Sequence, residues 1–476
     1  MSGKIMQLND RIREYLESHR DEIVGELKEL IKFKSVRGEA EEKAPFGKAC
    51  AEILKYTESL YLKEGFETEL DEDGGYLLSY FGKGDRTLGL FAHADVVPVG
   101  DDWMLTNPFE PLEQNDCIIG RGALDNKSAV LISLYCAKLI KELSIPFNSL
   151  LVMFTGSNEE SGMGDIKYFL SRNKAPDFSL VCDTAFPLYR GNKGVIRFAS
   201  ESVDCLSSGV SINGGTGATV IGGATAVLPF SGDLLAQLEA ANDDRITVLQ
   251  KGDRLEVSAK GIPKHSAIPE GSLNAVAVLA KALLECKTLN ENDRRLFATL
   301  YKMANCHYGE FFGIENDDEE YGKLTCVLAQ VGTFQNGKVE VRFNIRYGEG
   351  AVTDDIVNKS AEKLRLCGFG EPNVSMCSVP HTLKSDDSRV VELLNVYKEF
   401  TGNEKAVSCV NAGGTYRQYL KNAVETGPTL RFGGVEGLIN GHGGAHQPDE
   451  YINITGLLRA IELTLLMLLK CDGIML

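Results

Sequence analysis

A histidine and an aspartate stand two residues apart in the stretch FAHADVVPVG, residues 91–100, at the end of an apolar run. The run is typical of a buried strand. Because alternate strand residues point the same way, His93 and Asp95 share a face. One of these two side chains could bind a metal ion while the other accepts the spare imidazole N–H. A lone buried histidine is more often a satisfied core residue, so a metal site here requires ligands from other stretches.

Three further stretches offer carboxylates beside predicted strands or helices. Asp125 lies in GRGALDNK (residues 120–127), Glu159 and Glu160 lie in TGSNEESGMG (155–164), and Asp183 lies in LVCDTAFP (180–187). The ends of strands are the usual place for sites in open α/β sheets. Taken singly, each has a plain structural explanation: a helix cap for Asp125, a solvated acidic turn for the glutamates and a turn start for Asp183.

The chain has only seven histidines, and two of them, His442 and His446, fall in the glycine-rich stretch GHGGAHQPDE. A histidine displayed on such a loop is difficult to explain as core packing. His265 lies between two prolines in GIPKHSAIPEGSLN. The set of His93, Asp125, Glu159 with Glu160, Asp183 and His446 provides nitrogen and oxygen donors that suit Zn²⁺, Mn²⁺ or Co²⁺ rather than Ca²⁺. The surplus of acids indicates two ions that share a carboxylate.

The elements that must position these residues alternate between strands and helices, which predicts an α/β layer architecture. Periodicity predicts helices within residues 8–33, 49–64, 127–143 and 165–172. It predicts strands at 66–70, 76–81, 87–93, 150–155 and 178–182. After residue 183 the character changes, with long irregular stretches expected over 198–253. Strands are expected at 254–260 and within 325–347, and helices at 273–285 and 354–366. Residues 388–400 resume a helix, and residues 454–469 form an amphipathic one.

This pattern predicts a middle domain inserted into a domain made from both ends of the chain. We expect residues 1–188 and 385–476 to form one domain and residues 189–384 to form the insertion. A chain of 476 residues is too long for one compact core.

Composition narrows the function classes. The net charge of −17 argues against nucleic acid and anionic membranes as partners. The twelve cysteines are scattered without a C-x-x-C pair, which suits a reducing cytoplasm. The first residues are charged throughout and have no apolar signal core. We therefore expect a soluble cytoplasmic protein. The sequence also contains no G-x-S-x-G elbow, Walker loop or H-E-x-x-H motif.

The chain resembles the M20 metallopeptidase family, most closely its PepV-like and Sapep-like bacterial dipeptidase branch. Eight ordered motifs carry the resemblance: FAHADVVPVG, GRGALDNK, GSNEESG, CDTAFP, GIPKHSAIPEGSLNA, FNIRY, GGTY and AHQPDE. The resemblance runs from about residue 10 to the C-terminus. It implies an α/β catalytic domain, in which helices flank a mixed sheet as in di-zinc peptidases, and an inserted α+β lid domain.

The resemblance also implies a role for each candidate residue. Asp125 would bridge two metal ions, with a cis peptide bond to Asn126. Glu159 would be the general base, and Asp95 would orient His93. The remaining roles are metal binding by His93 and Asp183 at one ion, metal binding by Glu160 and His446 at the other, oxyanion stabilisation by His265, binding of the substrate carboxylate by Arg346, and lining of the substrate pocket by Gly413, Gly414, Thr415 and Tyr416.

The implied activity is that of a dipeptidase dependent on two divalent ions, with zinc expected first and manganese or cobalt as alternatives. It would hydrolyse the amide bond of short unblocked peptides through a metal-bridging water. A large lid that supplies its own residues favours a monomer. The alternatives are an M20-type deacylase acting on N-acyl amino acids and a non-catalytic binding homologue.

Three positions depart from the family pattern: Asn126, Asn158 and Ala226. Relatives often have an aspartate at the position of Asn158 and an asparagine that helps bind substrate at the position of Ala226. The departures therefore concern how the substrate is recognised. None of the inferred metal ligands is missing, which argues against an inactive homologue.

Overall fold

The computed structural model describes residues 2–240, 243–430, 432–439 and 441–474. The chain divides into two compact units: unit 1 comprises Met1–Gly191 and Thr382–Leu476, and unit 2 comprises Asn192–His381. Unit 2 is thus one continuous segment inserted into unit 1. The division expected from the sequence, after residues 188 and 384, lies close to these boundaries.

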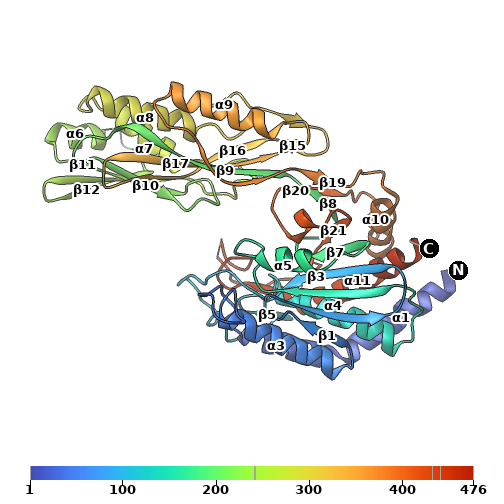
Figure 1. The fold of residues 1–476 in the computed structure, drawn as a ribbon. Coiled ribbons are helices and arrows are strands. Elements are labelled where there is room, and N and C mark those ends of the chain that lie inside the picture. The colour runs from blue at the N-terminus through green and yellow to red at the C-terminus, as the bar shows by residue number, and fades with distance from the viewer. Residues whose placement is uncertain (1, 241–242, 431, 440, 475–476) are drawn as a thin grey trace. The chain divides into compact units, whose positions relative to one another are not determined.

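Unit 1 is built on a mixed sheet with the strand order β1-β2-β6-β3-β7-β21-β8-β19, in which β20 also pairs with β8 (Figure 1). The central strands β6, β3, β7 and β21 run parallel, whereas β1, β2 and β8 join antiparallel. The strands are β1 Glu67–Leu70, β2 Tyr76–Gly82, β3 Thr87–His93, β6 Leu150–Gly156, β7 Phe178–Cys182, β8 Tyr189–Asn192, β19 His381–Thr382, β20 Cys409–Asn411 and β21 Ala423–Thr426.

The central strands are apolar on both faces because both faces are covered. Along β3, Leu88, Leu90 and Ala92 point into the larger core, to which helices from both ends of the chain contribute. Phe91 points the other way, into a smaller core that the helices at 164–172 and 416–419 cover. A near-continuous apolar run is what a parallel strand buried on both sides requires. Unit 1 confirms the expected mixed sheet flanked by helices.

The helices of unit 1 are α1 Ser2–Ser18, α2 Arg20–Lys32, α3 Lys48–Lys63, α4 Lys127–Glu142, α5 Gly164–Arg172, α10 Ser388–Thr401, η1 Tyr416–Tyr419 and α11 Ile454–Ile474. A small sheet of order β22-β5-β4 joins the two ends of the unit. It pairs β22 Tyr451–Asn453 with β5 Cys117–Ile119, and β5 with β4 Leu112–Gln114. This pairing fixes the segment just before β22 against the loop that precedes α4.

Unit 2 is an antiparallel sheet of order β12-β13-β11-β10-β16-β17-β9-β18, with helices packed on its core side (Figure 1). Its elements are β9 Gly194–Cys205, β10 Ser211–Gly215, β11 Gly223–Pro229, α6 Gly232–Ala240, β12 Ile246–Lys251, β13 Arg254–Lys260, α7 Ala275–Glu285, α8 Glu291–Ala304, β14 Asp317–Asp318, β15 Gly322–Lys323, β16 Thr325–Thr333, β17 Lys338–Tyr347, α9 Thr353–Leu366 and β18 Asn373–Ser378. The expected α+β insertion is confirmed.

The expectation of long irregular stretches over 198–253 was wrong, since β9 to β12 and α6 occupy most of this segment. In β9 the buried face includes Ser200 and Ser202. These two polar residues mask the period-two signal of a strand. Helix α8 was not predicted, although Leu296, Phe297, Leu300 and Met303 recur at helical spacing and Asn290 caps it by accepting the N–H of Asp293.

Within the described part of the chain, none of the helices is long and apolar enough to span a membrane. The twelve cysteines are all free thiols.

Candidate active site

The carboxyl ends of the parallel strands bring the candidate residues of unit 1 together. His93 is the last residue of β3, and Asp183 directly follows β7. Glu159 and Glu160 lie in the loop after β6, whose Gly156 pairs with His93 in the register of β3 and β6. Parallel strands end at one edge of a sheet, so side chains at these ends converge.

Asp125 lies between two histidines. Its Oδ1 is 3.2 Å from His93 Nε2, and its Oδ2 is 3.2 Å from His446 Nε2. His93 Nε2 is also 3.4 Å from Asp183 Oδ1, and His446 Nε2 is 3.0 Å from Glu160 Oε1. The five side chains thus form two groups, each with one imidazole and two carboxylates, and Asp125 belongs to both.

The donor atoms fit divalent cations. His93 Nδ1 lies 3.0 Å from the backbone carbonyl oxygen of Asp95, to which an Nδ1–H can donate. In that tautomer Nε2 presents a lone pair to the carboxylates of Asp125 and Asp183. This buried nitrogen has no hydrogen-bond partner among the described residues. Lone pairs that converge in this way are satisfied by a cation, and imidazole with carboxylate suits Zn²⁺, Mn²⁺ or Co²⁺.

Clusters of possible ligand atoms within 4.8 Å of one another include His93 with Asp125 and Glu160, and also His93 with Glu159 and Asp183. Glu159 therefore lies within reach of the same centre as the metal-ligand candidates. It is buried, and its Oε1 has no hydrogen-bond partner among the described residues. An unpaired carboxylate oxygen beside a cation site is available for proton transfer.

The pKa values of the site's side chains are shifted because several ionisable groups are buried close together. Burial and the Asp183 carboxylate raise the pKa of Glu159 well above its usual range. Burial and Asp125 raise the pKa of Glu160 to about 7. Burial opposes protonation of His93, but Asp183 and the other carboxylates raise its pKa well above the ordinary value. The centre thus gathers more negative charge than its own imidazoles balance, which favours a bound cation.

Comparison with known proteins identifies the family to which the chain belongs. Residues 89–470 match the model of Peptidase family M20/M25/M40. The chain belongs to this family. Over 471 residues it is 28% identical to "Putative dipeptidase YtjP" of Bacillus subtilis (strain 168), with 93% of this chain and 96% of that protein covered. Over 475 residues it is 26% identical to a protein of Staphylococcus aureus (strain USA300), also named a putative dipeptidase, with 95% and 97% covered.

A solved structure with a similar fold is the dipeptidase Dug1p from Saccharomyces cerevisiae. Its TM-score is 0.59 at 15% sequence identity, with 98% of each chain covered. At this identity the likeness concerns the fold.

Asp95 organises two parts of the site in this M20 member. Its carboxylate oxygens accept the backbone N–H groups of Glu159 at 3.0 Å and Glu160 at 3.1 Å. The nearest oxygen to His93 Nδ1 is the Asp95 backbone carbonyl at 3.0 Å, while the carboxylate lies 3.5 Å away. The Asp95 carboxylate thus holds the backbone of the glutamate loop, and its role in orienting the His93 imidazole stays a prediction.

Glu450 was missed as a site residue, although it lies in the quoted motif AHQPDE. Its Oε1 accepts the backbone N–H groups of Gly122 at 3.0 Å, Leu124 at 2.9 Å and Asp125 at 2.9 Å. Its Oε2 accepts from Arg121 Nη1 at 2.5 Å. Glu450 is fully buried and thus fixes the backbone that presents Asp125. Its place at the end of the AHQPDE motif was the sequence signal that could have identified it.

Asn126, noted in the sequence only as a departure, connects the two sides of the centre. Its Nδ2 donates to Cys182 O at 2.7 Å and Asp183 Oδ1 at 3.0 Å, and its Oδ1 accepts the His93 N–H at 3.2 Å. The Asp125–Asn126 peptide bond is cis, as predicted.

The GGTY loop lies beside the centre. Gly413, Gly414 and Thr415 line a cavity of about 300 Å³ that also includes Asp125, Glu159, Glu160, Asp183 and His446. The Thr415 hydroxyl donates to the buried Glu425 at 2.5 Å. The Tyr416 hydroxyl donates to Asp165, whose carboxylate accepts the Asn158 N–H at 2.7 Å. The loop is therefore tied to the glutamate loop through Asp165.

His442 does not join the centre's charge cluster. Its Nδ1 is 2.7 Å from Asp449 Oδ2, and the same carboxylate accepts the backbone N–H groups of Met104 and Leu105. The pair holds the loop around Met104 against the segment before β22.

His265 and Arg346 belong to unit 2. His265 is exposed, and its Nδ1 accepts the Ala267 N–H at 3.3 Å. Arg346 on β17 is 4% exposed, and its Nε has no hydrogen-bond partner among the described residues. Burial and the neighbouring Arg197 lower the pKa of Arg346 to about 9. A desolvated guanidinium of this kind suits an anionic ligand.

Proposed function

We propose that the protein is a dipeptidase that depends on two divalent metal ions. The observation that carries the proposal is the position of Asp125, whose two carboxylate oxygens each lie 3.2 Å from the Nε2 atom of a different histidine. A carboxylate placed in this way can bridge two ions. The names of the curated relatives agree with cleavage of dipeptides.

The proposed ligands are His93 and Asp183 for one ion, Glu160 and His446 for the other, and Asp125 for both. Ions bound there would polarise the scissile carbonyl and lower the pKa of water. Zinc is proposed first, with manganese or cobalt as alternatives, because the donor types accept all three.

Glu159 is proposed as the general base. A carboxylate oxygen of Glu159 lies within 4.8 Å of ligand atoms of His93 and Asp183, and the two N–H···Asp95 bonds fix the backbone of the loop that presents it. In this role it accepts a proton from the attacking water and delivers it to the nitrogen of the leaving amine. Gly413, Gly414 and Thr415 are proposed to line the peptide site. His265 is proposed to stabilise the oxyanion and Arg346 to bind the substrate's α-carboxylate.

The proposal is tested by metal analysis of the purified protein, followed by a panel of dipeptides and N-acetyl amino acids with each metal restored. We expect two ions per chain and hydrolysis of unblocked dipeptides. Hydrolysis of N-acetyl amino acids alone would instead identify a deacylase. A monomeric state and a cytoplasmic location stay predictions.

Two variants separate metal binding from proton transfer. Glu159→Ala should keep both ions and lose turnover by at least about 100-fold, since general-base catalysis contributes about 10²–10⁴-fold. Glu160→Ala should lose both turnover and part of its metal content. Full turnover in Glu159→Ala would remove this residue from the mechanism, and a chain that binds dipeptides without cleaving them would be a binding homologue.

A further inference from the structure

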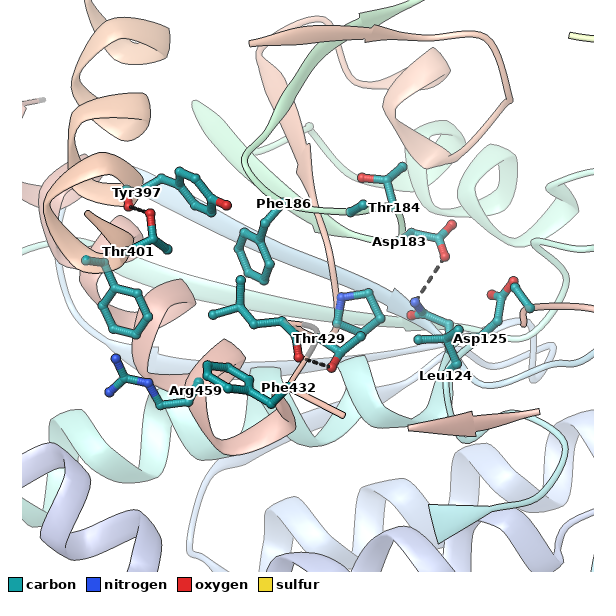
Figure 2. Close-up of a pocket in the computed structure, with 16 residues that line it drawn as sticks. Leu124, Asp125, Asp183, Thr184, Phe186, Tyr397, Thr401, Thr429, Phe432 and Arg459 are labelled. Carbon is teal, nitrogen blue, oxygen red and sulfur yellow. Dashed lines mark hydrogen bonds between the residues drawn. The ribbon is translucent and has the colours of Figure 1, made fainter. Parts of the chain in front are cut away.

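A second and larger cavity in unit 1 opens from the same centre. It has a volume of about 810 Å³, within the range of small-molecule sites. Asp125 and Asp183 stand at one side of it, and Arg459 and Phe432 stand at the other (Figure 2). The mechanism proposed above makes no use of this space.

Aromatic side chains form much of its wall. The rings of Phe186 and Tyr397 stack with their centroids 6.2 Å apart, and both line the cavity. Phe400 lines it from the same helix as Tyr397, namely α10. Phe432 also lines it and is 55% exposed. Covering a large exposed aromatic ring on a cavity wall with an apolar group is favourable because it removes apolar surface from water.

The one cationic side chain of the described lining is already engaged. Arg459 donates to the buried carboxylate of Glu462, and its guanidinium carbon lies 4.1 Å from the centre of the Phe400 ring. Glu462 in turn accepts from Arg13 at 2.9 Å. Arg459 is therefore held in place by Glu462 and packs against the Phe400 ring as part of the wall.

The two cavities indicate which end of a peptide belongs in each. They share Asp125, Asp183, Thr184 and Ala185, but only the smaller one includes Glu159. The nitrogen that receives the proton from Glu159 belongs to the C-terminal residue of a dipeptide. A peptide whose C-terminal residue lies on the Glu159 side would direct the side chain of its N-terminal residue toward the aromatic cavity.

We propose that the aromatic cavity is the subsite for a large apolar side chain on the N-terminal residue of the substrate. This inference rests on the proposed dipeptidase function and adds a substrate class to it. Each methylene that enters a hydrophobic pocket changes kcat/KM by about 10-fold or more. Leucyl-glycine should therefore be cleaved with at least about a 10-fold higher kcat/KM than alanyl-glycine.

The test compares substitutions on one helix. Thr401 lies on α10 and lines the cavity, whereas Glu399 lies on α10 outside the lining; both are exposed. Thr401→Trp puts an indole into the cavity, and Glu399→Trp is the matched control. Phe432→Ala, at an exposed position, removes part of the wall without adding bulk. Full-length protein with its metal restored is assayed with leucyl-glycine, alanyl-glycine, glycyl-leucine and glycyl-alanine.

We expect Thr401→Trp to lower the kcat/KM ratio of leucyl-glycine to alanyl-glycine by at least about 10-fold. Phe432→Ala should lower the same ratio, and Glu399→Trp should leave it unchanged. The ratio of glycyl-leucine to glycyl-alanine should stay the same in all variants. A change in that second ratio instead would overturn the assignment to the N-terminal residue.

Two negative outcomes have different meanings. Dipeptide hydrolysis with both ratios unaffected by Thr401→Trp and Phe432→Ala would refute the subsite and leave the dipeptidase proposal standing. If the metal-restored wild type cleaves none of the four dipeptides, the proposed function itself fails, and the subsite fails with it.

Discussion

Replacing Glu450 by glutamine should destabilise unit 1 and loosen the candidate metal centre. Glu450 and Arg121 are a buried ion pair, 0% and 1% exposed, with Nη1 and Oε2 2.5 Å apart. The amide keeps the shape of the side chain but leaves the Arg121 guanidinium as an uncompensated buried charge. Breaking a buried pair from one side costs about 3–5 kcal/mol of unfolding free energy.

The chain provides its own probe for this experiment. Its single tryptophan, Trp103, has the Arg121 guanidinium 5.5 Å from its ring. Urea unfolding followed by Trp103 fluorescence therefore reports on this part of unit 1. We expect Glu450→Gln to lower the unfolding free energy by about 3–5 kcal/mol. The control variant Glu436→Gln lies at an exposed position of the same segment, and its unfolding free energy should stay within about 0.5 kcal/mol of the wild-type value.

A double-mutant cycle isolates the interaction between Glu450 and Arg121. Arg121→Met alone leaves the buried Glu450 carboxylate without its ion-pair partner, whereas the double variant removes both charges. The double variant should therefore be more stable than the sum of the single effects predicts, by at least about 2 kcal/mol. Affinity for the metal should fall by about 10–100-fold in Glu450→Gln, because its bonds to the backbone that presents Asp125 weaken. Additive single effects, or a loss below about 1 kcal/mol in Glu450→Gln, would refute this account.

Three further predictions concern neighbouring residues. Asp125→Asn should reduce the metal content from two ions per chain to one or fewer, as measured by elemental analysis after dialysis; retention of two ions would contradict the bridging role. Asn126→Ala removes the bonds to Asp183 and to the His93 backbone, and metal titration should show an affinity lower by about 10–100-fold; unchanged affinity would argue against this positioning role. Burial and the Asp95 carboxylate raise the pKa of Asp165 to about 6. The protonated Asp165 side chain therefore stabilises the folded protein fully below the ordinary aspartate pKa, and this contribution is lost as the pH rises past 6. The unfolding free energy of the metal-free wild type, relative to Asp165→Asn, should therefore fall by about 2–3 kcal/mol between pH 4 and pH 7, and a difference that does not depend on pH would contradict it.

The sequence allowed the ends of the strands to be predicted because each apolar run stops at a polar residue. His93 and Asp183 follow runs that are buried on both faces, so their placement at one edge of the sheet follows from the pattern. The same logic located Glu159 and Glu160 after β6. These positions depend on local periodicity, which a single sequence displays.

The supporting contacts could not be predicted in the same way. Glu450 acts through backbone N–H groups more than 320 positions away along the chain. Any residue type supplies a backbone N–H, so this partnership leaves no pattern in residue types. The strands of 198–253 escaped prediction for another reason: serines occupy buried positions of β9, and hydrogen bonds such as that from Ser200 Oγ to Gly370 O satisfy them there.

The pairing of β22 with β5 has a consequence for how the protein is made. It brings Glu450 to the loop of Asp125, yet all of unit 2 is translated between them. At about 5–20 residues per second, the ribosome takes on the order of ten seconds or more to cross that insertion. Unit 2, as a continuous segment, has all its strands available to fold during that interval. His446 and Glu450 emerge only after unit 2 has been translated, so the candidate site cannot be completed until the chain has passed through the whole insertion.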